Sequence, residues 1–150
     1  MCAQALERMA AAFFEGTEGL VLDGLRFERV DGNALMLSKY HRHASITNST
    51  FAWLGGSAVA LWGWTDEVSD GGVHGVDGTG GEYPRWTTIE RNLFREIGIF
   101  EKQSSAVFQA KGAQTTIARN VVFNLARAGI NFNGAPRAAV APRPSRVPLL

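Results

Sequence analysis

The sequence has a single cysteine, Cys2, and lacks any apolar run approaching the roughly 18 residues of a membrane span. One cysteine excludes an internal disulfide and leaves the redox compartment open. The start, MCAQALERMAAAFFEG, has no basic stretch ahead of its apolar part and is interrupted by Glu7 and Arg8, unlike a secretory signal peptide. The sequence alone therefore assigns no cellular location and predicts no membrane partner.

The sequence also has almost no excess of charge of one sign. The formal net charge is +1, and the three arginines of residues 135–150 are balanced by no acid, so residues 1–134 carry a formal charge of −2. A slightly acidic body without a lysine and arginine stripe argues against nucleic acid as the main partner.

What the sequence does contain is a repeat between residues 19 and 62. When the segment is shifted by 24 residues, equivalent residue types coincide without gaps. A repeat of this length predicts a solenoid, whose units bury their apolar faces by stacking on one another. The coinciding pairs are Leu22 with Ile46, Gly24 with Asn48, Phe27 with Phe51, Val30 with Leu54, Gly32 with Gly56 and Ala34 with Ala58.

Two less regular copies follow, at residues 88–111 and 116–133. Each copy has a β-branched strand, an Asn or Gly, a Phe, an aliphatic residue and a strand that begins with small residues. Three β segments in a turn of roughly 22–25 residues predict an all-β fold, a right-handed parallel β-helix of about four coils. We expect one corner of the coils to carry Asn48, Asn92 and Asn120, and an inner aromatic column to contain Phe27, Phe51, Phe94 and Phe123.

The remaining segments flank or interrupt this β-helix, which we place at residues 16–134. Residues 1–15 are predicted to form a short helical cap, and residues 63–86 an inserted glycine-rich loop. Residues 135–150 hold four of the five prolines and are expected to be disordered. The acids of the inserted loop follow no D-x-D-x-D-G register, so a Ca²⁺ site is a weak interpretation and we predict no cofactor. Because the coil pattern stops at Gly134, the chain is interpreted as a fragment or as a shortened relative.

The alternation of the four alanine-containing strands predicts which side chains face the core. The residues expected to point inward are Ala34, Met36, Ser38, Ala58, Ala60, Trp62, Ala106, Phe108, Ala110, Ala128, Ile130 and Phe132. The outward residues of the first two coils would then be Leu35, Leu37, Val59 and Leu61, which we expect the inserted loop to cover.

In the last two coils the outward positions are polar. With neighbouring coils about 4.8 Å apart, we expect three pairs: Gln109 beside Asn131, Lys111 beside Asn133, and Ser105 beside Arg127. A loop at residues 98–104 adds Glu101, Lys102 and Gln103 beside this face. Such an array suits a ligand rich in hydroxyl or carboxylate groups, and an ordinary solvated face is the alternative of equal weight.

Three pieces of sequence are more particular than the coil pattern: DGTGGEYPRWT (77–87), EIGIFEKQSSAVFQAK (96–111) and ARAGINFN (126–133). They resemble a group of large, functionally uncharacterised β-helix-repeat proteins of the pectate-lyase-like superfamily. The resemblance implies a polysaccharide or oligosaccharide partner, an active outer sheet face and, as in many proteins with this fold, an extracellular setting. The fold also hosts adhesins and structural proteins.

Two classes of function follow from these residues. A lyase would use Lys102 or Lys111 as base, with Arg127 holding a substrate carboxylate and the other polar-face residues binding the sugar. A hydrolase needs two carboxylates about 5–9.5 Å apart, which Glu101 or Glu96 with Asp77 or Glu82 would have to supply. The alternative is a non-catalytic carbohydrate-binding or structural β-helix, or an inactive fragment. His41 and His43 are too few to predict a metal site.

Overall fold

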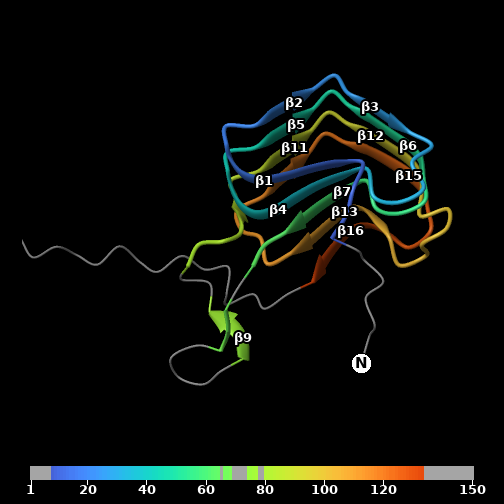
Figure 1. The fold of residues 1–150 in the computed structure, drawn as a ribbon. Helices are drawn as coiled ribbons and strands as arrows, with labels where there is room; N and C mark the ends of the chain where they lie inside the picture. The colour runs from blue at the N-terminus through green and yellow to red at the C-terminus, as the bar shows by residue number, and fades with distance from the viewer. Residues whose placement is uncertain (1–7, 65, 69–73, 78–79, 134–150) are drawn as a thin grey trace, which may run out of the picture.

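The computed structural model describes residues 8–64, 66–68, 74–77 and 80–133, without the side chains of 66–68 and 74–77. In these residues the regular secondary structure is entirely β-strand. The strands form three parallel sheets and one two-stranded antiparallel sheet (Figure 1). We name the parallel sheets A, B and C in the order in which the chain first reaches them.

Each sheet collects strands that lie far apart in the sequence. Sheet A contains β1 (Ala12–Glu18), β4 (Leu35–Arg42), β7 (Val59–Trp62), β13 (Ser105–Ala110) and β16 (Ala128–Asn133), with β10 (Pro84–Arg85) also beside β4. Sheet B contains β2 (Val21–Asp23), β5 (Ser45–Thr47), β11 (Thr88–Glu90) and β14 (Thr116–Ala118). Sheet C contains β3 (Arg26–Glu28), β6 (Thr50–Leu54), β12 (Leu93–Ile97) and β15 (Val121–Leu125).

The chain visits sheets A, B and C in turn and then returns to A, and we call each such set of strands a rung. Rungs 1 to 4 begin at β1, β4, β7 and β13, and β16 follows rung 4. Strand pairing places Leu22 beside Ile46 and Phe27 beside Phe51. The predicted 24-residue repeat is therefore confirmed in rungs 1 and 2.

One core lies between the three sheets. Its central aromatic residues are Phe27, Phe51 and Phe94, whose rings stack with centroids 5.2 Å and 5.0 Å apart. The fourth member was predicted wrongly: Phe94 pairs with Val122, and Phe123 is 43% exposed. Phe123 stands one residue later in its rung than the other three, and strand alternation turns it to the opposite face.

The predicted inward and outward faces of sheet A are interchanged in the structure from Leu35 on, whereas Ala34, Ala58 and Ala106 at the strand starts pack in the core as predicted. Leu35, Leu37, Val59 and Leu61 pack in the core with side chains of sheets B and C. Met36, Ala60, Phe108 and Ala110 instead form a second buried cluster on the other face, together with Ala10 and Trp62. These strands are apolar on both faces, so alternation alone does not distinguish inside from outside. The leucine-rich face faces the core and needs no covering loop.

The predicted helical cap is wrong for the residues that the structure describes. Ala12–Glu18 is strand β1, paired with β4, because a free strand edge offers a short segment more hydrogen bonds than an isolated helical turn. The preceding residues cross the outer face of sheet A, where Arg8 donates to Ser38 Oγ (3.2 Å) and to the carbonyl of Gly63 (2.8 Å). No helix in the described segments is long and apolar enough to cross a membrane. Residues 1–7 and the predicted disordered tail lie outside those segments.

The predicted insertion lies inside rung 3. Rung 3 leaves sheet A after β7 and returns at β10, whose two residues pair with His41 and Arg42 of β4. Between them is the antiparallel pair of β8 (Asp66–Val68) and β9 (His74–Asp77), which projects from the sheets in Figure 1. The insertion therefore contains strands, and Tyr83 at its end is buried.

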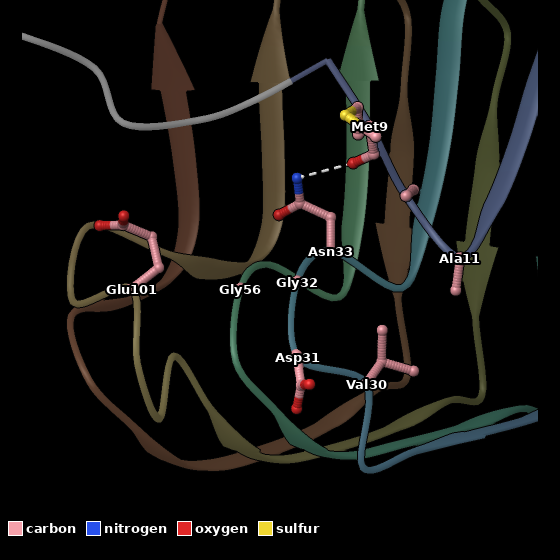
Figure 2. Close-up of a pocket in the computed structure, with 9 residues that line it drawn as sticks. Met9, Ala11, Val30, Asp31, Gly32, Asn33, Gly56 and Glu101 are labelled. Atoms are coloured by element: carbon pink, nitrogen blue, oxygen red, sulfur yellow. Dashed lines mark hydrogen bonds between the residues drawn. The ribbon is translucent and has the colours of Figure 1, made fainter.

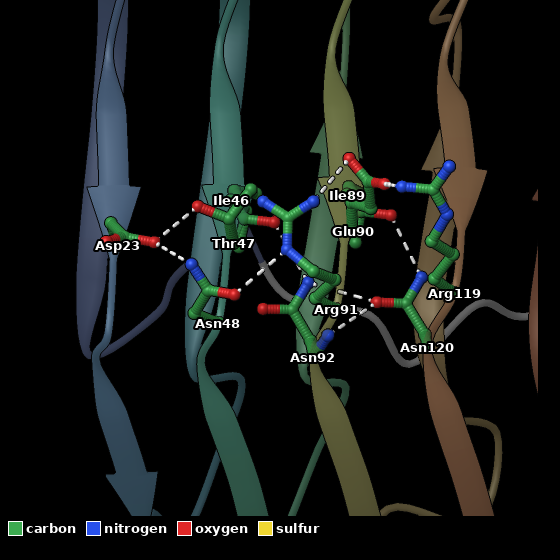
Figure 3. A network of polar contacts seen from close by, with 10 residues as sticks. All are labelled: Asp23, Ile46, Thr47, Asn48, Ile89, Glu90, Arg91, Asn92, Arg119 and Asn120. Atoms are coloured by element: carbon green, nitrogen blue, oxygen red, sulfur yellow. Dashed lines mark hydrogen bonds and ion pairs between the residues drawn. The ribbon is translucent and has the colours of Figure 1, made fainter.

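An asparagine ladder joins sheets B and C at their shared corner (Figure 3). Asn92 donates to the carbonyl of Ile46 and accepts from the backbone amide of Ser49, both at 2.9 Å. Asn120 repeats this one rung later, with the carbonyl of Ile89 and the amide of Asn92. The predicted corner is confirmed for Asn92 and Asn120. Asn48 lies at the same corner, where it accepts from Arg91, but Ser49 takes its place in the ladder.

Left-handed backbone recurs at equivalent places from rung to rung. Twelve described non-glycine residues have φ between 50° and 59°, where an L side chain costs roughly 1–2 kcal/mol. Strand register sorts all twelve, with three glycines of positive φ, into four columns. The columns are Gly16, Lys39 and Lys111; Gly19, His43, Trp86 and Gln114; Gly24, Asn48, Arg91 and Arg119; and Arg29, Trp53, Glu96 and Asn124.

We predict that Phe51→Ala lowers the free energy of unfolding by about 3–5 kcal/mol, because Phe51 is the middle ring of the buried stack. Phe123→Ala should cost less than about 1 kcal/mol, since that ring is exposed. Urea denaturation of both variants checks this. Equal losses would contradict the corrected register.

We also predict acid sensitivity from His41, which is fully buried. Its Nε2 lies 3.0 Å from the Phe14 carbonyl and 2.9 Å from the Ser38 carbonyl, so Nε2 carries the proton and Nδ1 accepts from the Thr17 hydroxyl. Burial lowers the pKa of His41 below its usual 6.5, and the bonds to these carbonyls offset this only in part.

His41 therefore binds a proton more readily in the unfolded chain than in the folded chain, and the free energy of unfolding falls as the pH drops below about 6.5. The stabilisation that depends on neutral His41 is fully present above that pH. Stability stops falling below the lowered pKa of His41. Thermal unfolding between pH 8 and pH 5 should show this slope in the wild type and lose it in His41→Gln. His43→Gln, which removes an exposed imidazole, is the control and should keep the slope.

Candidate ligand-binding site

The polar face predicted on β13 and β16 is not assembled. Gln109 is buried, with its amide donating to the Gly112 carbonyl (3.1 Å) and accepting from the Thr115 hydroxyl (2.6 Å). Its neighbour on β16 is Phe132, not Asn131, because the two strands pair one residue away from the predicted register. Ser105 is likewise buried, beside Ala128.

The two candidate lysine bases lie at opposite ends of β13, a strand of six residues or about 20 Å. The Lys102 ammonium donates to the carbonyls of Gly98 (3.2 Å) and Ile99 (2.6 Å), so it holds its own loop together. Lys111 occupies a left-handed corner position. Arg127 is exposed before β16, and Asn131 and Asn133 lie on the outer face of that strand, beside Phe108 and Ala110. The structure thus does not bring the lysines and Arg127 into one site.

The loop at residues 98–104 reaches a different corner, between sheets C and A. Ile97 pairs with Leu54, and the amides of Phe100 and Glu101 donate to the Gly55 carbonyl at 3.3 Å and 2.8 Å. Gly55 in turn donates to the carbonyl of Val30. The loop of rung 3 therefore leaves its strand where rung 1 carries Asp31.

Two hollows meet at this corner, and together we call them the corner groove. The first has a volume of about 420 Å³ and is lined by Met9, Ala10, Ala11, Val30, Asp31, Gly32, Asn33, Gly56 and Glu101 (Figure 2). The second, of about 470 Å³, is lined by Arg29, Val30, Asp31, Trp53, Ile99 and Phe100. Val30 and Asp31 belong to both.

Acceptor groups come to the groove from two rungs. Asp31 follows sheet C of rung 1, and Glu101 lies on the loop of rung 3. The Glu101 carboxylate accepts from the backbone amide of Gln103 at 3.1 Å, which fixes the side chain against its own loop. Asn33 supports the wall between them by donating to the Met9 carbonyl (3.0 Å) and accepting from the Ser57 amide (2.9 Å). The groove thus offers hydrogen-bond acceptors on a braced backbone.

The second hollow has an aromatic wall. Phe100 is 69% exposed, and Trp53 is half-buried with a left-handed φ of 50°. The Arg95 guanidinium lies 3.9 Å from the Trp53 ring centroid and fixes the indole by a cation–π contact. A bulky residue in left-handed backbone is strained, and such strain is found where a side chain has to be held in one direction.

Sequence reasoning placed Glu101 in a site but missed Asp31, Trp53 and Phe100. The signal was present in the repeat, because aligning Leu54 with Ile97 puts Gly98 on the same corner as Asp31. The loop was instead assigned to the face of the strand that follows it. The position of the loop is set by the end of β12, from which the chain departs, and β12 ends at the corner between sheets C and A.

The other candidate acids and the two histidines of residues 41–43 lie apart from the groove. Glu96 accepts from the Asn124 amide at 2.8 Å, Glu82 is exposed, and the Asp77 side chain lies outside the described residues. His41 is buried whereas the His43 ring stacks on Trp86. Across the side chains that the structure describes, no group of three or more His, Cys, Asp or Glu gathers as metal ligands.

In comparisons with known proteins, no family model matches the chain, and no curated protein or solved structure matches it.

We predict that Gly55→Ala disrupts this corner. A Cβ on Gly55 would lie 1.8 Å from the Asp31 carbonyl oxygen, so backbone has to move, at a cost of about 1–3 kcal/mol or more. Gly32→Ala is the matched control, because its Cβ would meet no atom within 4 Å. Urea denaturation should separate the two variants, and equal stability would contradict the described packing of rung 1 against rung 2.

Proposed function

We propose that the chain is a right-handed parallel β-helix that binds neutral oligosaccharide in the corner groove. The architecture is supported by three parallel sheets visited in a fixed order around one core. It is the architecture of the pectate-lyase-like superfamily, which residues 96–111 and 126–133 resemble. A solenoid of this kind gives a rigid frame on which corner loops hold ligand groups.

The observation that carries the glycan proposal is the joining of an aromatic wall to carboxylate acceptors in one groove. Sugar rings have apolar faces, which pack on Trp53 and Phe100, and hydroxyl edges, which donate to Asp31 and Glu101. Aromatic side chains joined to a few placed polar groups are typical of small-ligand sites. In the first hollow an anionic glycan is disfavoured, because the carboxylates of Asp31 and Glu101 would repel it.

Hydrolysis of the bound glycan is a second candidate. It is favoured by one observation, namely that Asp31 and Glu101 come from different rungs and line the same hollow. Paired carboxylates are the catalytic groups of most glycoside hydrolases. In that role one carboxyl would protonate the leaving oxygen and the other would act as base or nucleophile. Lyase chemistry is less favoured, since the candidate bases and Arg127 are dispersed.

We predict that the protein binds neutral tetrasaccharides with Kd values of about 0.1–10 mM, the range of a shallow groove. Calorimetric titration with cellotetraose, xylotetraose and mannotetraose, and with tetragalacturonate as the anionic control, measures this. Trp53→Gly should remove most of the affinity without loss of stability, because glycine relieves the left-handed strain while deleting the indole.

Asp31→Asn and Glu101→Gln distinguish binding from catalysis. Both amides keep an acceptor, so affinity should fall less than about tenfold, whereas hydrolysis assayed as new reducing ends should disappear. If none of the neutral glycans binds the wild type, or if Trp53→Gly binds as tightly as the wild type, the groove is not the glycan site. Binding without turnover would leave the binding function and reject the hydrolase.

A further inference from the structure

A stack of flat side chains runs along the outside of the corner between sheets A and B. The His43 and Trp86 rings lie parallel, with centroids 4.9 Å apart and planes 7° from each other. The Arg85 guanidinium lies 4.2 Å from the Trp86 ring centroid and donates to the Gln114 side chain through Nε (3.1 Å) and Nη2 (2.8 Å). The corner groove plays no part in these contacts.

This stack follows one of the left-handed columns, which register fixes. Arg42 pairs with Arg85, so His43 stands beside Trp86, and Arg85 pairs with Ala113, so Gln114 comes next. At the other end Glu18 pairs with Arg42, so Gly19 stands beside His43. Rungs 2, 3 and 4 thus supply His43, Trp86 and Gln114 to the column, and rung 1 supplies no side chain.

The missing side chain leaves open space against an exposed ring. Gly19 has the same left-handed backbone as the rest of its column, with φ of 63°. A Cβ built on Gly19 would meet no atom within 4 Å. His43 is exposed, and Trp86 is 39% exposed. We call the position over Gly19, on the His43 ring, the imidazole shelf.

The edge of the shelf carries a hydrogen-bond acceptor. Glu18 immediately precedes Gly19, and its exposed carboxylate accepts from the Tyr40 hydroxyl. Arg42 packs over the Tyr40 ring at 4.1 Å and donates to the carbonyls of Gly81 and Tyr83. These contacts brace the acceptor beside the shelf. A ring that stacks on His43 would therefore meet a carboxylate at its rim, which suits a hydroxyl donor and disfavours an anion.

We propose that the imidazole shelf is a second glycan subsite, in which one neutral pyranose ring stacks on His43 in place of the side chain that Gly19 lacks. A ring hydroxyl donates to the Glu18 carboxylate. This proposal rests on the ligand class of the proposed function and extends it to a separate place. The shelf and the corner groove lie at opposite ends of the sheet A strands, which span eight residues in β4, or about 27 Å.

Filling the shelf tests the proposal. Gly19→His places an imidazole where the ligand ring would stack, in a column whose backbone already accepts His43 and Trp86. Gly24→His is the matched control: Gly24 has φ of 66° and equally open space, but it belongs to a different column. The two variants carry similar backbone strain, so a difference between them reports the shelf.

The readout is the indole N–H signal of Trp86 in ¹H–¹⁵N NMR spectra, assigned with Trp86→Phe, during titration with cellotetraose, xylotetraose and mannotetraose. At concentrations up to about 10 mM, where weak sites fill, at least one neutral glycan should shift the Trp86 signal in the wild type and in Gly24→His. Gly19→His should weaken this response at least tenfold. Glu18→Gln should weaken it less.

The outcome separates the two sites. A Trp86 shift that persists in Trp53→Gly supports the shelf even if the corner groove binds no glycan. A shift of the Trp53 indole signal without a shift of the Trp86 signal overturns the shelf alone. A Trp86 shift that survives unchanged in Gly19→His also overturns it, as does a response to tetragalacturonate that exceeds the response to every neutral glycan.

Discussion

Parallel, in-register pairing between successive rungs is the constraint on which the rest of the structure depends. Because the strands of sheets A, B and C lie beside the equivalent strands of the next rung, equivalent positions form columns along the molecule. The same residue type or backbone conformation therefore recurs in neighbouring rungs. The results are the ladder of asparagine amides, the stack of phenylalanine rings and the columns of left-handed residues. Core and surface are both organised by the same register, and a one-residue displacement moves a side chain from one to the other.

The left-handed columns explain where this molecule can present chemistry. Strand positions alternate between faces, and both faces of sheet A are largely buried at β4, β7 and β13, so these strands have little free surface. A left-handed corner instead directs its side chain outward, and Trp53, His43 and Trp86 all occupy such corners. The strain of these backbones is spread over the rungs, and the ring and guanidinium contacts between neighbours offset part of it.

The sequence predicted the repeat and the rung length because residues 19–62 coincide without gaps and pairing depends on that spacing. It predicted the ladder from Asn92 and Asn120, which recur in the two later copies. It failed where two arrangements have the same pattern. Met36 and Leu35 are both apolar, so their alternation did not indicate which one faces the core, and the candidate face on β13 and β16 depended on that choice. Asp31 was missed because a single acid at a corner carries no local motif. Only the stacking of rung 3 on rung 2, and of rung 2 on rung 1, brings it into the same hollow as Glu101.

The insertion in rung 3 shows where the molecule tolerates additional residues. The chain departs from sheet A after Trp62 and resumes pairing at Pro84, while the rungs on either side keep their own register. Neighbouring turns of the molecule thus accommodate about twenty extra residues without a change in spacing. This junction is accordingly a natural acceptor for foreign peptides, and a guest segment introduced between Gly63 and Tyr83 would be displayed beside an intact scaffold.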